Sequence, residues 1–273
     1  MPVTPKTLIE IGLAAGREIM AVYADVTFGH RHKGDGSPVT EADHRAEAVI
    51  LQALAAEAGD MPVVAEEEMS AGRMPAIEDR FFLVDPLDGT REFINRNGEF
   101  TVNIALIEKG FPAAGMIFAP ALGQVFVAAG GMAWRAQVNH GVAEELKPIR
   151  TRPAPARIAA TGSRSNCTDE TFQWLKRFEV EEFTSRGSSL KFCQIACGEA
   201  DIYPRFGRTM EWDTAAGDAI LRAAGGITTT IGGIPLSYGN HNVSGGDDFA
   251  NPSFVAFGDP ALRDAAGERI LRA

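Results

Sequence analysis

The chain has 273 residues, of which 45% are hydrophobic and 23% charged, a composition typical of a globular protein with one large domain or two packed halves. Its formal net charge of −10 argues against a general nucleic-acid-binding protein, because such proteins normally carry a basic surface. No apolar run approaches the roughly 20 residues that a membrane-spanning helix needs, and the N-terminus lacks the residue order of a signal peptide. We therefore expect a cytoplasmic protein, with peripheral association at the inner face of the membrane left open.

The three cysteines indicate a reducing compartment, because a low and odd cysteine count fits free thiols. Cys193 and Cys197 are four residues apart and could share one face of a helix. We interpret them as small core residues, since no histidine or further cysteine stands nearby at the spacing of a metal site.

In the first half of the chain, two helices are expected to precede a set of strands. Apolar residues spaced by three and four predict an amphipathic helix over 8–22, and Thr40 precedes a second helical stretch over about 41–58. The glycine-bearing stretch between them, 28–38, is expected to be a loop.

Short apolar runs then predict buried strands. The runs at 63–65 and 81–84 each end in acidic residues, and 69–80 between them is expected to be an exposed loop. Residues 101–135 alternate apolar and polar positions between glycine and proline turns, which predicts several further strands.

The second half, 151–273, is expected to follow a link at 148–155, where prolines separate it from the first half, 1–150. A Gly- and Asn-rich stretch over 232–248 is expected to be a loop. Helices and mixed sheets in both halves indicate a layered α/β architecture. The expected elements are strands near 157–161, 181–184, 200–203 and 254–257, and helices near 168–178, 189–197, 213–224 and from about 260.

The segment DPLDGT, residues 85–90, directly follows the second apolar strand. It places two carboxylates, Asp85 and Asp88, at the carboxyl end of a strand, where α/β sheets usually place ligands. The carbonyl of Leu87 between them could point the same way, and Gly89 lets the backbone approach a ligand closely.

Two further acidic elements occupy comparable positions. Glu66 opens a glutamate triplet after the strand at 63–65, and Asp213 stands at the start of a helix. Such a triplet is usually a solvated turn, and Asp213 could serve as an N-cap while keeping a second face for a metal. Carboxylates that converge repel one another unless a cation lies between them, and Mg²⁺ prefers carboxylate, carbonyl, water and phosphate oxygens. The pattern therefore predicts a magnesium site.

Together these elements resemble the inositol monophosphatase superfamily of metal-dependent, lithium-sensitive phosphatases. Its signatures are an acidic pair after a strand, Asp-Pro-[Leu/Ile]-Asp-Gly-Thr and Trp-Asp-x-Ala-Ala-Gly, and all three occur here in order. Longer stretches are similar to the CysQ-type bacterial branch, the 3′(2′),5′-bisphosphate nucleotidases. These stretches are DPLDGTREFINRNGEFTVNIALI (85–107), GSSLKFC (187–193) and YPRFGRTMEWDTAAG (203–217).

The resemblance implies an αβαβα sandwich, and an enzyme that hydrolyses adenosine 3′,5′-bisphosphate to AMP and phosphate, clearing a by-product of sulfate activation. It also implies a monomer or homodimer with two or three Mg²⁺ ions. The implied metal ligands are Glu66, Asp85, Asp88, Asp213 and the carbonyl of Leu87.

In the mechanism that we expect, the attacking water is carried by a metal held through Glu66, Thr90 orients this water, and Asp43 relays its proton. Lys33 and Asp43 match family positions, although Asp43 could equally complete a capping box with Thr40. Asp85 as a covalent phosphoryl acceptor is the chemical rival.

Substrate contacts are expected from loops and helix starts in the second half. Ser163, Arg164 and Ser188 are candidates, and Lys191 and Arg205 are candidates for the second phosphate or the ribose, although solvated basic residues would give the same pattern. Asp88, Gly89, Thr90 and Asp213 are also expected to contact the substrate.

Two other functions fit parts of the pattern. An inositol or sugar phosphate phosphatase would share the same metal ligands. A non-catalytic regulatory protein that binds metal or nucleotide would tolerate the loss of a ligand or of Thr90, yet every expected position is filled.

Overall fold

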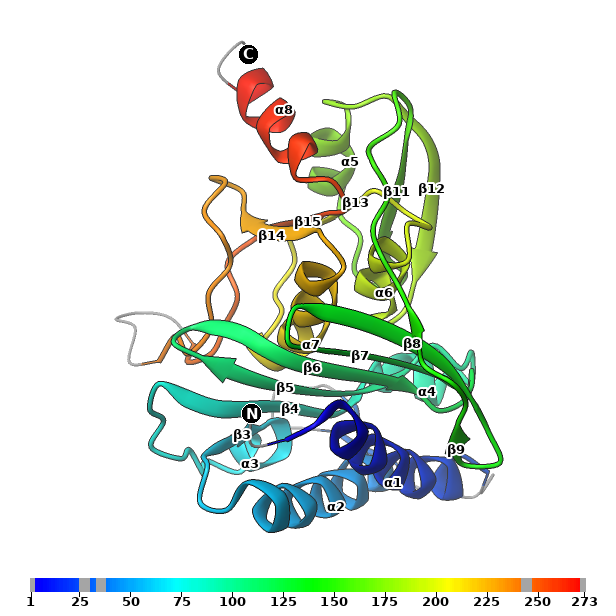
Figure 1. The fold of residues 1–273 in the computed structure, drawn as a ribbon, viewed down its shortest axis with the longest axis vertical. Helices are drawn as coiled ribbons and strands as arrows, with labels where there is room; N and C mark the ends of the chain where they lie inside the picture. The colour runs from blue at the N-terminus through cyan, green and yellow to red at the C-terminus, as the bar shows by residue number, and fades with distance from the viewer. Residues whose placement is uncertain (1–2, 25–29, 33–37, 242–246, 271–273) are drawn as a thin grey trace.

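Five alternating layers of helix and sheet make up the protein in a computed structural model that describes residues 3–24, 30–32, 38–241 and 247–270 (Figure 1). From one end to the other they are a pair of helices, a large sheet, a second pair of helices, a smaller sheet and two peripheral helices. The expected αβαβα sandwich is therefore confirmed. No helix in these ranges is long and apolar enough to cross a membrane.

The large sheet has eight strands in the order β10-β8-β7-β6-β5-β4-β3, with β9 paired to β8. β3 runs parallel to β4, and the other neighbours are antiparallel. The strands are β3 (Val63–Ala65), β4 (Arg80–Asp88), β5 (Thr101–Glu108), β6 (Phe111–Ala119), β7 (Gln124–Ala129), β8 (Met132–Asn139), β9 (Val142–Ala143) and β10 (Lys147–Pro148).

Both faces of this sheet are buried, which explains the continuous apolar runs in its strands. In β4, Phe82 and Val84 pack into the core shared with α1 (Pro5–Ala24) and α2 (Glu41–Ala58). Phe81 and Leu83 point to the opposite face, because successive side chains of a strand alternate. There they pack into the core shared with α6 (Leu190–Ala196) and α7 (Glu211–Ala223).

The smaller sheet lies on the other side of α6 and α7, and its order is β12-β11-β13-β15-β14. β11 is parallel to β12 and β13, whereas β15 is antiparallel to β13 and β14. The outer face of this sheet forms a third core with two helices. Its elements are β11 (Ile158–Ser163), β12 (Val180–Arg186), β13 (Ile202–Arg205), β14 (Ile227–Thr230), β15 (Phe254–Phe257), α5 (Asp169–Leu175) and α8 (Pro260–Ile270).

The expected helices and strands of both halves are present, with a few differences. A hairpin of β1 (His30–His32) and β2 (Pro38–Thr40) lies in the stretch expected to be a loop, most of which falls outside the described residues. The glutamate triplet begins a short helix, α3 (Glu66–Ser70), and strand β14 was not expected. The division into halves 1–150 and 151–273 stays a prediction.

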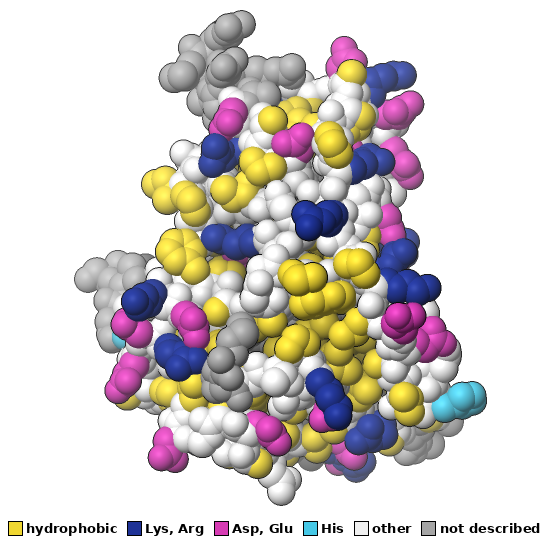
Figure 2. All heavy atoms as spheres, viewed as in Figure 1, with side chains coloured by type: hydrophobic (Ala, Val, Ile, Leu, Met, Phe, Trp, Pro, Cys, Tyr) yellow, Lys and Arg dark blue, Asp and Glu magenta, His cyan; other side chains and the backbone are white. Residues whose placement is uncertain are grey.

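Surface charges on the face shown in Figure 2 are mixed, with acidic and basic side chains scattered among apolar ones. The acidic excess of the chain therefore does not form one acidic surface in this view. Cys193 is buried in the core and Cys197 is partly buried, and both are free thiols.

Candidate active site

Asp85 and Asp88 face the same side of the large sheet because β4 carries an irregularity between them. Residues three apart on a regular strand point to opposite faces. Here, however, Asp85 pairs with Asn103 and Asp88 pairs with Thr101, so that the three-residue step on β4 lies opposite a two-residue step on β5. The extra residue is a β-bulge, which restores the two aspartates to one face while Leu87 turns into the core of α1 and α2.

After Asp88 the chain turns into a short helix, α4 (Thr90–Ile94). Gly89 precedes this helix with a φ of 89°, a conformation that favours glycine. The Asp85 carboxylate accepts the amide of Leu87 at 3.0 Å through Oδ1, and the Thr90 hydroxyl lies 3.5 Å from the Leu87 carbonyl. The DPLDGT segment is thus an ordered turn at the end of β4.

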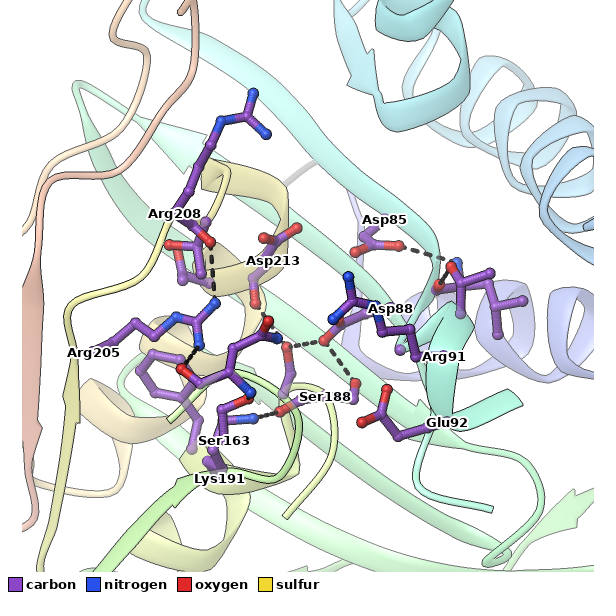
Figure 3. A pocket seen from close by; sticks show the side chains of 18 of the residues that line it. Asp85, Asp88, Arg91, Glu92, Ser163, Ser188, Lys191, Arg205, Arg208 and Asp213 are labelled. Carbon is purple, nitrogen blue, oxygen red and sulfur yellow. Dashed lines mark hydrogen bonds between the residues drawn. The ribbon is translucent and has the colours of Figure 1, made fainter. Parts of the chain in front are cut away.

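The Asp88 carboxylate is held by the large sheet and by the turn before α6. Its Oδ2 accepts the Ser188 hydroxyl at 2.6 Å and the Ser189 hydroxyl at 2.9 Å (Figure 3). The Asn103 amide lies 3.4 Å from the same oxygen. Both serines belong to the turn before α6, whereas Asn103 belongs to β5. Asp88 therefore lies where the large sheet meets the layer of α6 and α7.

Asp213 is the third residue of α7 rather than its N-cap, which corrects the expected position. The N-cap is Met210, whose amide donates to Asp213 Oδ2 at 2.9 Å in a capping-box arrangement. A carboxylate in the first turn is also favoured by the helix dipole. One oxygen of Asp213 is thereby fixed by its own helix.

Glu66 begins α3, and this helix is capped by a side chain of α2 rather than by its own N-cap residue. Its N-cap residue Ala65 offers no side-chain hydrogen bond, but the buried Glu47 of α2 accepts the Glu67 amide at 2.8 Å. Burial raises the pKa of Glu47 to about 7. The start of α3, and with it Glu66, is therefore fixed against α2.

These four acids line one cavity of about 270 Å³ together with a set of basic side chains. In the view of Figure 3, Asp85 and Asp88 lie on one side, Arg205 and Lys191 lie on the other, and Asp213 lies between them. The lining residues are Glu66, Asp85, Leu87, Asp88, Gly89, Thr90, Arg91, Glu92, Ser163, Asn166, Ser188, Ser189, Lys191, Phe192, Tyr203, Arg205, Arg208, Thr209, Asp213 and Thr214.

The acids repel one another electrostatically. Burial raises the pKa of Asp85 well above its ordinary value, and the negative charges of Glu66 and Asp88 raise it further. Burial likewise raises the pKa of Asp213 to about 8, with Asp88 and Glu66 as further causes. A cation among these carboxylates would favour their charged forms and relieve the repulsion.

The oxygen atoms available in this cavity suit the coordination of magnesium. Among the described residues, the hydrogen bonds to Asp85, Asp88 and Asp213 each end on a single carboxylate oxygen, so that the other oxygen of each residue can bind a cation. No three His, Cys, Asp or Glu side chains in the described ranges already form a group that could hold a metal ion. Such a group is not required, because Mg²⁺ usually keeps several waters and binds one or two carboxylates plus substrate phosphate.

The remaining expected site residues lie in different surroundings. Asp43 is fully buried in the first turn of α2 and is not among the lining residues, although its charge contributes to the raised pKa of Asp85. Arg164 is not a lining residue either, because it forms a two-fold hydrogen bond with Glu99 at 3.0 Å. Lys33 lies outside the described residues.

Several residues in the cavity, or hydrogen-bonded or paired to its aspartates, were not expected from the sequence, although some left a signal. Thr101 and Asn103 are polar positions in the otherwise apolar run TVNIALI, and they pair with the two aspartates of β4. Ser189 and Arg208 lie inside stretches that carry the family resemblance. Glu92 also lies inside such a stretch, 85–107, whereas Asn166 lies outside all three and has no such signal.

Comparison with known proteins identifies the family. Residues 4–255 match the inositol monophosphatase family. The chain belongs to this family. The 3′(2′),5′-bisphosphate nucleotidase CysQ of Salmonella typhimurium is 45% identical over 241 residues, which cover 88% of this chain and 94% of that protein. CysQ of Escherichia coli is 43% identical over 245 residues, covering 88% and 94%.

The fold of the inositol monophosphatase family is also found in a solved relative. The crystal structure of CysQ from Bacteroides thetaiotaomicron matches this chain with a TM-score of 0.75 and 35% identity, and the match covers 93% of this chain and 96% of that one.

Proposed function

We propose that this protein is a Mg²⁺-dependent 3′(2′),5′-bisphosphate nucleotidase that releases phosphate from adenosine 3′,5′-bisphosphate and leaves AMP. The observation that carries the proposal is the acidic and basic division of one cavity. Its acidic part consists of Glu66, Asp85, Asp88 and Asp213, with Arg91 beside Asp88, and its basic part contains Lys191 and Arg205. Arg208 also lines the cavity, but it is paired with Asp247. The relatives named as nucleotidases support the same substrate class.

The acidic part would bind two or three Mg²⁺ ions, which would supply an activated water and neutralise the charge of the reacting phosphate. Glu66 would hold the ion nearest the attacking water, and the Thr90 hydroxyl would orient that water. Asp43, buried near Asp85, would take up its proton. Asp85, Asp88 and Asp213 would hold the ion nearest the leaving oxygen, so that the alkoxide leaves against positive charge.

Arg205 is the best-placed group for the second phosphate. Its guanidinium is held by two main-chain carbonyls, those of Asn166 at 3.1 Å and Arg208 at 3.0 Å. Its Nε is buried and has no hydrogen-bond partner in the described part of the chain. A cation that is fixed in this way loses little entropy when it binds an anion.

Lys191 has a different role. Its ammonium donates to the carbonyls of Ser188 and Arg186 and lies 5.2 Å from the centre of the Tyr203 ring. Burial lowers its pKa to about 8. Because two of its three ammonium hydrogen atoms are directed to the main chain, Lys191 would act on the substrate mainly through its charge.

The substrate comparison tests this proposal. Phosphate release is measured from adenosine 3′,5′-bisphosphate, from AMP and from inositol 1-phosphate, with Mg²⁺ present and then chelated. We expect Mg²⁺-dependent release from the bisphosphate at a kcat/KM at least about 100-fold above the other two, because a buried arginine would discriminate by roughly 3 kcal/mol. A preference for inositol 1-phosphate would exclude the nucleotide substrate while keeping the metal site.

An Asp→Asn pair separates catalysis from stability. Asp88→Asn should lower kcat by about 100-fold or more, since it removes a charge from the metal site. Asp201→Asn is the matched control, because Asp201, which directly precedes β13, is buried in an ion pair with Arg152 and does not line the cavity. It should lower the free energy of unfolding and leave kcat unchanged. Normal turnover by Asp88→Asn would remove Asp88 from the metal site.

A further inference from the structure

The hydroxyl of Ser189 connects two of the proposed metal ligands. It lies 2.9 Å from Asp88 Oδ2 and 2.7 Å from the main-chain carbonyl of Asp213. Asp88 ends a strand of the large sheet, whereas Asp213 lies in the first turn of α7. Ser189 itself is only 2% exposed and precedes α6. One side chain at the start of α6 thus touches residues from two other elements, β4 and α7.

The number of hydrogen atoms limits what Ser189 can donate. A hydroxyl has one donor and two acceptor positions. The Asn103 amide donates to Ser189 Oγ at 2.9 Å, so that the single hydroxyl hydrogen remains for either Asp88 or the Asp213 carbonyl. Carboxylates are the stronger acceptors. The Ser189 hydroxyl therefore donates mainly to the Asp88 carboxylate and orients it. Its second possible acceptor is the Asp213 carbonyl.

The neighbouring Ser188 completes the arrangement. Its hydroxyl donates to the same oxygen of Asp88 at 2.6 Å and also contacts the Thr101 hydroxyl. Ser188 adopts a φ of 51°, which is uncommon for a residue with a side chain. Among the described residues, every hydrogen bond to the Asp88 carboxylate thus ends on Oδ2, and Oδ1 receives none.

The turn that carries both serines is held from the loop between α4 and β5. The buried Glu99 accepts the Gly187 amide at 2.8 Å and binds the side chains of Arg164 and Arg186, each at 3.0 Å. A Cβ atom at Gly187 would lie 2.5 Å from the Glu99 carbonyl oxygen, so that only glycine fits there. Glu99 thereby fixes the main chain one residue before Ser188.

We propose that Ser189 is a positioning residue of the metal site. It orients the Asp88 carboxylate and fixes its position relative to the start of α7. This inference rests on the proposed function, since it requires Asp88 to bind the metal. With Ser189 in place, Asp88 presents one defined oxygen to the cation. Without it, the Asp88 carboxylate keeps only the Ser188 and Asn103 contacts and can rotate more freely. The main-chain carbonyl of Asp213 then loses its contact with the turn before α6.

The test measures Mn²⁺ binding in the absence of substrate. The electron paramagnetic resonance signal of the free ion gives the concentration of Mn²⁺ that is not bound. We expect Ser189→Ala to weaken Mn²⁺ binding by about 10-fold, the lower range for residues that orient a metal ligand. In turnover, the Mg²⁺ concentration for half-maximal activity should rise by a similar factor. The KM for nucleotide at saturating Mg²⁺ should stay within about two-fold, because Ser189 acts through Asp88.

Three further variants make the result decisive. Ser189→Cys is nearly isosteric and a weaker donor, so it should weaken Mn²⁺ binding without leaving a cavity. Thr161→Val is the control, because it removes a buried hydroxyl that donates to Gln194 at 2.8 Å in the smaller sheet. It should bind Mn²⁺ as the unmodified protein does. Asp88→Asn should weaken binding more than either Ser189 variant.

The outcomes distinguish the inference from the proposed function. Unchanged Mn²⁺ binding by both Ser189 variants, with weakened binding by Asp88→Asn, would overturn the role of Ser189 and keep the metal site. Unchanged binding by Asp88→Asn would overturn both. A loss in Thr161→Val equal to that in Ser189→Ala would also overturn the inference, because it would assign the effect to lost stability.

Discussion

Two helix layers pack against the large sheet, and they differ in what they contribute to the cavity. The outer layer, α1 and α2, covers one face of the sheet through apolar side chains and contributes no residue to the cavity lining. The central layer, α6 and α7, lies between two sheets (Figure 1). It contributes Lys191, Phe192, Asp213 and Thr214 to the lining.

The two helix layers also differ in how far their helices can shift. A helix covered on one side can shift by a fraction of an ångström into solvent, whereas a helix between two sheets has close-packed atoms on both sides. Residues at the start of α7 therefore keep their positions relative to β4 and β5. The outer layer acts on the site indirectly, as Glu47 does when it caps α3.

The largest expected effect comes from a matched pair of isoleucines. Ile220 of α7 and Ile19 of α1 are both fully buried, and replacement of either by alanine should lower the free energy of unfolding by about 2–5 kcal/mol. Only Ile220→Ala should also lower kcat, because it loosens the helix that carries Asp213. Urea unfolding and steady-state kinetics measure both quantities. Equal losses of kcat in the two variants would contradict the comparison.

A smaller effect is expected from a pair of glycines at the two helix contacts. A Cβ atom at Gly115 of β6 would lie 2.8 Å from the Ala216 carbonyl oxygen of α7, which cannot move away. Gly115→Ala should therefore cost about 1–3 kcal/mol of unfolding free energy. A Cβ atom at Gly12 of α1 would instead meet the flexible end of Met116.

Gly12→Ala serves as the control for this pair. The methionine end can move, and alanine favours a helix by about 1 kcal/mol over glycine, so that the variant should be close to neutral. Thermal unfolding of both variants compares the two contacts directly. A loss at Gly12 as large as that at Gly115 would show that the outer helix is held as tightly as the central one.

The smallest effect concerns the contact by which Glu99 anchors the turn before α6. Burial raises the pKa of Glu99, but hydrogen bonds from Gly187, Arg186 and Arg164 outweigh burial and leave the pKa below its ordinary value. A lowered pKa in the folded state means that Glu99 adds stability above the ordinary glutamate pKa. This stability is lost as the pH falls through the folded-state pKa.

Glu99→Gln isolates this contribution. The difference in unfolding free energy between the unmodified protein and Glu99→Gln should be largest near pH 7 and should shrink between about pH 5 and pH 3. Urea unfolding at a series of pH values measures it. A difference that stays constant over this range would show that the charge of Glu99 does not stabilise the turn.

Much of the fold and the acidic residues of the site could be predicted from the sequence, because apolar runs that end in acids are local patterns. The arrangement of the acids could not. Alternation along β4 alone would place Asp85 and Asp88 on opposite faces, and only the pairing with β5 reveals the bulge. The partner of Arg164 is Glu99, which is 65 residues away in the sequence, so no local pattern could have separated an ion pair from a substrate contact.

The number of residues between Asp85 and Asp88 helps to determine the geometry of this site, because β4 carries a bulge there. Two acids separated by an odd step share a face only because one additional residue has been accommodated between them. Deletion of that residue would leave the two aspartates two positions apart, so that a regular strand would still place both on one face, but it would remove the bulge that turns Leu87 into the core of α1 and α2. The additional residue therefore gives the segment between the two acids one more main-chain carbonyl, beyond the common face that a shorter strand would also provide.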